Sequence, residues 1–233
     1  LDKLLAGFGP VVQQRTRTLA PGPAVVVFQQ LLQLGLVALT TMPDGTVHGG
    51  MVPKVRAAGL RASAGIQAGA AGIFFATSCA KHNLLSNTEY NEFARYYDFE
   101  VLRGARGGWF NTLHIHGHDI LFDELLDYPV HALNWHDSHE YPPLRRARAM
   151  TDLCIIGGLD EAGPIVNGSP SEVIDEVSRF LTETNLTGVM VGPGCVTTTS
   201  NIPENNITAT RLVVERYGDK DLWKYLSMDS SCL

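Results

Sequence analysis

The sequence predicts an α/β protein built on a mostly parallel β-sheet. From about residue 66 onward, short apolar runs alternate with helical patterns. This alternation is the order of strand, helix and strand found in βαβ units. Several of the runs are also apolar almost throughout, as expected for parallel strands that are covered on both faces.

Five runs are predicted as strands, at residues 72–77, 109–114, 130–135, 153–156 and 188–191, with two weaker candidates at 24–28 and 36–40. The chain contains no GxGxxG or GxxxxGK[ST] motif, which argues against dinucleotide-binding and P-loop folds. The remaining common arrangement is a (β/α)₈ TIM-type barrel, which typically needs about 250 residues. Because the chain has 233 residues, we expect a barrel that is incomplete or degenerate at its N-terminus.

Two helices are predicted from their first residues. Ser86-Asn-Thr-Glu89 and Ser169-Pro-Ser-Glu172 both match the capping box, in which a serine hydroxyl and a glutamate carboxylate bind free backbone N–H groups. Pro170 occupies the tolerated first helical position. After the second box, one apolar helical stripe is expected from Val173, Ile174, Val177, Phe180 and Leu181.

Composition excludes several classes of protein. The 18 Lys+Arg and 24 Asp+Glu give a net charge of −6 without a basic cluster, so neither nucleic acid nor an anionic membrane is an expected partner. The content of 45% hydrophobic and 18% charged residues excludes a disordered chain. Four cysteines are too few for a disulfide scaffold and favour a cytoplasmic location. The uncharged stretch 24–42 contains three glutamines, which favours a buried strand over a membrane span.

Polar residues follow the predicted strands at the point where each one ends. Ligand sites of parallel α/β proteins form at this edge, because the loops there converge on one face. The most specific set is His114, His116 and Cys195. Alternation along a strand places His114 and His116 on the same side, and a thiolate from another strand would complete an open zinc site with N, N and S ligands. The alternative is that the histidines cap carbonyl groups and the cysteine is a small buried hydrophobe.

Three carboxylates, Asp137, Asp160 and Glu161, also follow predicted strands. They can act as acid, base or ligand if they face the pocket. The alternative for Asp137 and Asp160 is that each one caps the helix that follows it.

The strand-end motifs resemble those of the uroporphyrinogen decarboxylase superfamily, which includes zinc-dependent methyltransferases acting on methylated corrinoids. The similarity covers roughly residues 66–216 and implies a (β/α)₈ barrel with its funnel at the carboxyl ends of the strands. It divides the chain into a poorly matching segment at 1–65, a barrel region at 66–216 and a tail at 217–233. The motifs that carry it are Ala68-Gly-Ala-Ala-Gly-Ile-Phe-Phe75, Glu89-Tyr-Asn-Glu-Phe93, His114-Ile-His-Gly117, Asn134-Trp-His-Asp137, Gly157-Gly-Leu-Asp160, Gly192-Pro-Gly-Cys195 and Pro203-Glu-Asn205.

Within that superfamily, the methyltransferase branch has His-x-Cys-Gly on one strand and Pro-Gly-Cys later. His114 and Cys195 match this pattern, whereas His116 stands where the branch has cysteine. Because imidazole is also a zinc ligand, a site with one thiolate would make the metal a stronger Lewis acid. The decarboxylase branch has Asn-Leu-Gly-His-Gly near the last strand, and its N-terminal arginine motif and early aspartate have no counterpart before residue 66.

The resemblance therefore implies an enzyme that acts on a small tetrapyrrole- or corrinoid-type substrate, with zinc activating a thiol or water for methyl transfer. His114, His116 and Cys195 are the expected metal ligands, and Asp137 and Glu161 the expected catalytic residues. A homodimer is among the expected assemblies. Substrate binding is expected from Phe75, Tyr90, Trp135, His136 and Asp160.

Two alternatives stay open at this point. The first is cofactor-free decarboxylation of the acetate side chains of uroporphyrinogen, in porphyrin biosynthesis, with Asp137 or a histidine assisting protonation. The second is a truncated barrel fragment that is inactive alone.

Overall fold

The computed structural model describes residues 40–41, 47–48, 51–197, 199 and 201–218. The predicted strand at 24–28 lies outside these residues, and so does all of the one at 36–40 except Thr40. The strands are β1 (Thr40–Thr41), β2 (Val47–His48), β3 (Phe74–Thr77), β4 (Thr112–Ile115), β5 (Ala132–Trp135), β6 (Cys154–Leu159) and β7 (Val189–Pro193). The helices are α2 (Met51–Gln67), α3 (Asn87–Tyr90), the π-helix η1 (Asn91–Arg95), α4 (Tyr96–Gly104), the 3₁₀-helix η2 (Phe122–Leu125), α5 (Leu144–Met150), α6 (Pro164–Asn167), α7 (Pro170–Glu183) and α8 (Glu204–Gly218).

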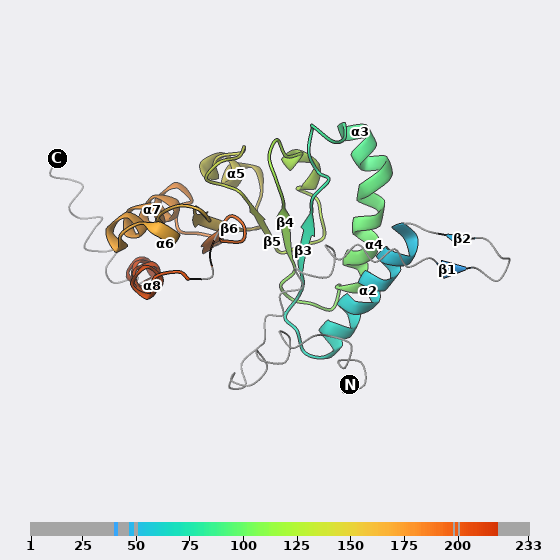
Figure 1. Cartoon of the computed structure of the whole chain (residues 1–233), viewed down its shortest axis with the longest axis horizontal. Helices are drawn as coiled ribbons and strands as arrows, with labels where there is room; N and C mark the ends of the chain where they lie inside the picture. The colour runs from blue at the N-terminus through green and yellow to red at the C-terminus, as the bar shows by residue number, and fades with distance from the viewer. Residues whose placement is uncertain (1–39, 42–46, 49–50, 198, 200, 219–233) are drawn as a thin grey trace.

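The central element is a parallel sheet with the strand order β3-β4-β5-β6-β7 (Figure 1). It confirms the predicted α/β class and the five predicted strands. Each strand lies beside the one that precedes it in the chain, whereas a doubly wound sheet reverses its order at a switch point. The sequential order is that of a TIM-like fold. In the described part of the chain, β3 and β7 form the sheet edges, so closure into an eight-stranded barrel stays a prediction.

The two faces of the sheet carry different residues. Leu113 and Ile115 of β4 and Leu133 and Trp135 of β5 are at most 1% exposed and belong to the hydrophobic core. Trp135 packs edge-on against Phe122 of η2, with 5.0 Å between ring centroids. Because side chains alternate along a strand, the residues between them face the opposite side. That opposite face carries the histidines described below.

Both predicted capping boxes are present. The Ser86 and Ser169 hydroxyls accept hydrogen bonds from the backbone N–H groups of Glu89 and Glu172, and each glutamate carboxylate accepts one from its serine N–H. The stripe of α7 is buried against the sheet, with one correction: Ile174 is 41% exposed. Val173 and Val177 already fill the buried face, and Ile174 lies about 100° further round the helix from Val173.

Helices α2 and α4 pack closely at a pair of glycines. A Cβ atom at Gly104 would lie 2.1 Å from the Gly59 carbonyl oxygen, so only glycine permits this crossing. The predicted boundary at residue 65 falls inside α2, and the one at residue 217 falls inside α8. Across the described residues, we find no helix with the length and apolar character needed to cross a membrane.

Candidate metal centre

Strand β4 supplies two histidines at its carboxyl end. His114 lies within the strand and His116 follows it directly, while Ile115 between them points into the core. The two imidazole rings therefore face the same side, with 5.6 Å between their centroids. His114 is only 2% exposed and stacks on Phe74 of β3 at 5.6 Å.

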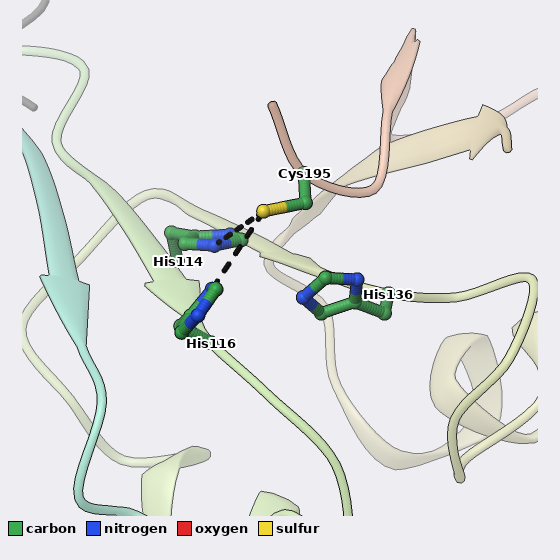
Figure 2. Close-up of side chains that lie close together, drawn as sticks. All are labelled: His114, His116, His136 and Cys195. Carbon is green, nitrogen blue, oxygen red and sulfur yellow. Dashed lines mark hydrogen bonds between the residues drawn. The ribbon is translucent and has the colours of Figure 1, made fainter. Parts of the chain in front are cut away.

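Cys195 approaches these rings from the end of β7. Its Sγ atom lies 3.6 Å from His114 Nε2 and 3.6 Å from His116 Nδ1 (Figure 2). The preceding Gly194 makes this approach possible, because a Cβ atom there would lie 2.7 Å from the Trp135 carbonyl oxygen and 3.0 Å from His136 Cα. The sequence separates the cysteine from His114 by 81 positions, and the parallel sheet brings them together.

His136 is the fourth member of the cluster. Each member of the cluster offers one potential ligand atom, and these atoms all lie within 4.8 Å of one another, so the group could hold a metal ion. The members are His114, His116, His136 and Cys195. Figure 2 shows all four side chains converging on one point. His136 was expected among the substrate-binding residues. The register between β4 and β5 explains why His136 lies in the cluster. His114 pairs with Asn134, so the next residues on the same face of the two strands are His116 and His136.

The surroundings of the cluster favour a thiolate. Burial acts to raise the pKa of Cys195, but hydrogen bonding by His114 and His136 outweighs it and lowers the pKa to about 5. The pKa of His136 is raised to about 9, first by Cys195 and then by Glu161, against the effect of burial. A thiolate with three imidazoles is a donor set that suits zinc, which binds nitrogen and sulfur ligands in tetrahedral sites.

The predicted carboxylates lie around His136, each in a different position. Glu161 Oε1 pairs with His136 Nδ1. Asp137 is 8% exposed, its Oδ2 accepts a hydrogen bond from the Gly158 N–H at 2.9 Å, and burial raises its pKa to about 7. Asp160 accepts from the Ala162 N–H at 2.9 Å and pairs with His139 Nε2 at 3.0 Å. Only Glu161 therefore touches a member of the cluster directly.

Three of the predicted substrate-binding residues lie in the hydrophobic core. Phe75 and Trp135 are 7% and 0% exposed, and alternation places them on the opposite face of the sheet from His114 and His136. Tyr90 is 0% exposed, and its hydroxyl bonds to Tyr128 and Asp98. The aromatic ring at the cluster is instead that of Phe74.

The chain is similar in fold to solved structures. A methyltransferase from Methanosarcina mazei aligns with a TM-score of 0.60 and 17% sequence identity, over 70% of this chain and 47% of that chain. The likeness is one of fold. The chain spans about half the length of that methyltransferase. No protein-family model matches the sequence, and no curated protein matches it.

Asn134 is a further residue of the site that the sequence did not indicate. This side chain is 2% exposed and lies behind His114, with its Oδ1 atom 2.7 Å from His114 Nδ1. An asparagine two residues before a candidate ligand, and therefore on the same face of its strand, is the pattern that could have indicated it.

Proposed function

We propose that this protein is a zinc-dependent methyltransferase of the uroporphyrinogen decarboxylase superfamily, transferring a methyl group from a corrinoid to a thiol. The observation that carries the proposal is the convergence of His114, His116, His136 and Cys195 at the carboxyl ends of parallel strands. This is the edge at which sheets of this type place their chemistry. The fold shared with a methyltransferase and the strand-end motifs support the same assignment.

His114, His116 and Cys195 would hold the zinc ion. Cys195 Sγ lies 3.6 Å from a ring nitrogen of each of these histidines. Three protein ligands are the usual set of a catalytic zinc site, which keeps one position open. When bound, zinc would supply a Lewis acid that lowers the pKa of a substrate thiol.

His136 would be the base of the reaction once zinc is bound, because the Cys195 thiolate that is the first cause of its raised pKa would then be bound to the metal. Its Nδ1 atom is held by Glu161, so Nε2 is the nitrogen left to exchange a proton. An imidazole oriented by a carboxylate is a common general base, so Nε2 is placed to take the thiol proton. The thiolate sulfur then attacks the methyl carbon, and the Co–C bond breaks with both of its electrons remaining on cobalt. The products are a thioether and a Co(I) corrinoid.

Metal content tests the first half of this proposal. We expect the purified protein, dialysed against zinc, to retain one equivalent by elemental analysis. The variants His114→Ala and Cys195→Ala should lose it, because each removes one of three ligands. His131→Ala is the matched control, since its Nδ1 accepts a hydrogen bond from the Asn111 N–H away from the cluster. Equal zinc content in all four proteins would contradict the proposal.

Methyl transfer tests the second half. With methylcobalamin and a small thiol, the zinc-loaded protein should convert the absorbance spectrum to that of the Co(I) corrinoid under anaerobic conditions. His136→Gln should retain zinc and slow the transfer by 10²–10⁴-fold, the usual contribution of a general base. Turnover of uroporphyrinogen that persists with a chelator, without methyl transfer, would favour the decarboxylase alternative.

A further inference from the structure

Asn134 joins the strands that carry the candidate ligands. It lies in β5, its side chain is on the face of the sheet that carries the histidines, and it is 2% exposed. Its Nδ2 atom lies 2.9 Å from the Ile156 carbonyl oxygen of β6 and 3.1 Å from the Pro193 carbonyl oxygen of β7. Its Oδ1 atom faces His114 Nδ1 of β4 at 2.7 Å. One buried amide thus contacts three neighbouring strands.

These contacts fix the orientation of the amide. Both carbonyl oxygens are acceptors only, so the group that faces them must be the NH₂ of the asparagine. The opposite orientation would place an oxygen against two oxygens in a buried site, at the loss of two hydrogen bonds. The oxygen of the amide is therefore the atom that faces His114.

The orientation of the amide in turn determines the tautomer of His114. An amide oxygen cannot donate, so His114 Nδ1 must carry the proton of their hydrogen bond. In a neutral imidazole the other nitrogen is then unprotonated and able to bind a metal. That nitrogen is Nε2, the atom that lies 3.6 Å from Cys195 Sγ.

We infer that Asn134 is a positioning residue that selects the Nδ1–H tautomer of His114 and presents the Nε2 lone pair to the cluster. Its bond to Pro193 also holds the chain two residues before Cys195, so one side chain orders ligands from both β4 and β7. Partners of this kind fix the ring orientation of metal-binding histidines, and their loss typically weakens metal affinity by 10–100-fold. The metal part of this inference rests on the proposed function, whereas the tautomer does not.

Two variants separate the parts of this role. Asn134→Leu removes the acceptor and both donated hydrogen bonds. Asn134→Asp keeps an acceptor facing His114 but removes the two donated bonds. Asn206→Leu is the matched control, because Asn206 is 1% exposed and its Nδ2 lies near three carbonyl oxygens, those of Pro164, Ile165 and Gly168, away from the cluster.

The first readout is the histidine tautomer in metal-free protein. Long-range ¹H–¹⁵N correlation spectra of protein labelled at histidine should show a proton on His114 Nδ1 at pH 8 in the unchanged protein, in Asn134→Asp and in Asn206→Leu. Asn134→Leu should lose this preference. The second readout is zinc affinity, measured by competition with a chelating dye. It should fall by about 10–100-fold in Asn134→Leu, and by less in Asn134→Asp.

The spectrum of the unchanged protein alone can overturn the inference. A His114 Nδ1 atom without a proton in metal-free protein would contradict it, whether or not any variant folds. An unaltered tautomer and unaltered zinc affinity in Asn134→Leu would contradict it equally. If zinc binds to none of the proteins while the tautomer behaves as expected, the proposed function fails and the positioning role of Asn134 stands.

Discussion

The three described cysteines differ in chemistry because their neighbours differ. Burial raises the pKa of Cys79 and Cys154. Cys195 is also partly buried, but the histidines beside it lower its pKa to about 5. Since the thiolate is the form that binds metals and attacks electrophiles, reactivity near neutral pH should concentrate on Cys195.

Alkylation at pH 6 tests this difference. A thiol of pKa about 5 has roughly 300 times the thiolate fraction of an ordinary thiol at this pH. Its lower intrinsic nucleophilicity offsets about 40-fold of that, which leaves a rate advantage of about tenfold. We expect iodoacetamide to label Cys195 about tenfold faster than Cys79 and Cys154 in the same protein, as followed by peptide mass spectrometry. Equal labelling of the three thiols would contradict the lowered pKa, and added zinc should slow the labelling of Cys195 alone.

Asp98 makes the stability of the fold depend on pH. This half-buried carboxylate accepts hydrogen bonds from the Tyr90 and Tyr128 hydroxyls, both at 2.9 Å. Burial raises its pKa from 3.8 to about 6, against the opposing effect of the two tyrosines and Arg95. The folded state therefore binds the proton more tightly than the unfolded state does. It follows that the contribution of Asp98 to stability is fully present below pH 4 and is lost as the pH rises through 6.

The variant Asp98→Asn should remove this loss. An asparagine carbonyl can still accept a hydrogen bond and carries no charge, so the variant should be more stable than the unchanged protein by about 1–2 kcal/mol at pH 7.5 and by less at pH 5. Urea unfolding at the two pH values measures both differences. Asp123→Asn, at an exposed position, is the control and should change neither value. A destabilised Asp98→Asn at pH 7.5 would show that the charge itself supports the fold through Arg95.

At the scale of the elements, the crossing of α2 and α4 depends on the absence of side chains. The Gly59 carbonyl oxygen occupies the space that a Cβ atom of Gly104 would need. Helix propensity alone favours alanine over glycine by about 1 kcal/mol in a helix interior. For Gly104→Ala, packing therefore predicts a loss of stability, whereas helix propensity predicts a gain.

We expect Gly104→Ala to destabilise the protein by about 2–4 kcal/mol, because a backbone clash cannot be relieved by a rotamer change. Thermal unfolding measures the effect. Gly218→Ala is the matched control, since a Cβ atom at this last residue of α8 would meet nothing within 4 Å. A stabilised Gly104→Ala would show that the two helices do not cross as described.

On the scale of the whole molecule, a metal at this site would join distant parts of the chain. The four candidate ligands lie at or just beyond the carboxyl ends of β4, β5 and β7, and the first and last of them are 81 positions apart in the sequence. The unfolded chain does not hold such a set together, so zinc should bind the folded state selectively.

Zinc should therefore raise the midpoint of thermal unfolding. With free zinc at 100 times its dissociation constant, the stabilisation is about 2.7 kcal/mol, which corresponds to a rise of about 5–11 °C in a protein of this size. Differential scanning fluorimetry with and without zinc measures the rise. Cys195→Ala should lose it, whereas Cys79→Ser should retain it. Stabilisation that persists in Cys195→Ala would place the zinc elsewhere.

The fold class and the helix starts were predictable because their signals are local. Alternating apolar runs identify strands, and a serine followed three residues later by glutamate identifies the beginnings of α3 and α7. His114 and His116 share a side for the same reason, since two residues is the period of a strand. Phe75 and Trp135 show the limit of such reasoning, because both lie near functional motifs and yet belong to the core face of their strands.

By itself, the sequence determined which residues are able to do chemistry and that the ends of parallel strands would carry them. Only the tertiary structure decided that His136 joins the expected set of His114, His116 and Cys195. The register between β4 and β5 brings His136 beside His116, and the bend at Gly194 carries Cys195 to both histidines. Register and turn geometry arise from hydrogen bonds between segments far apart in the chain, and no local pattern of residues records them.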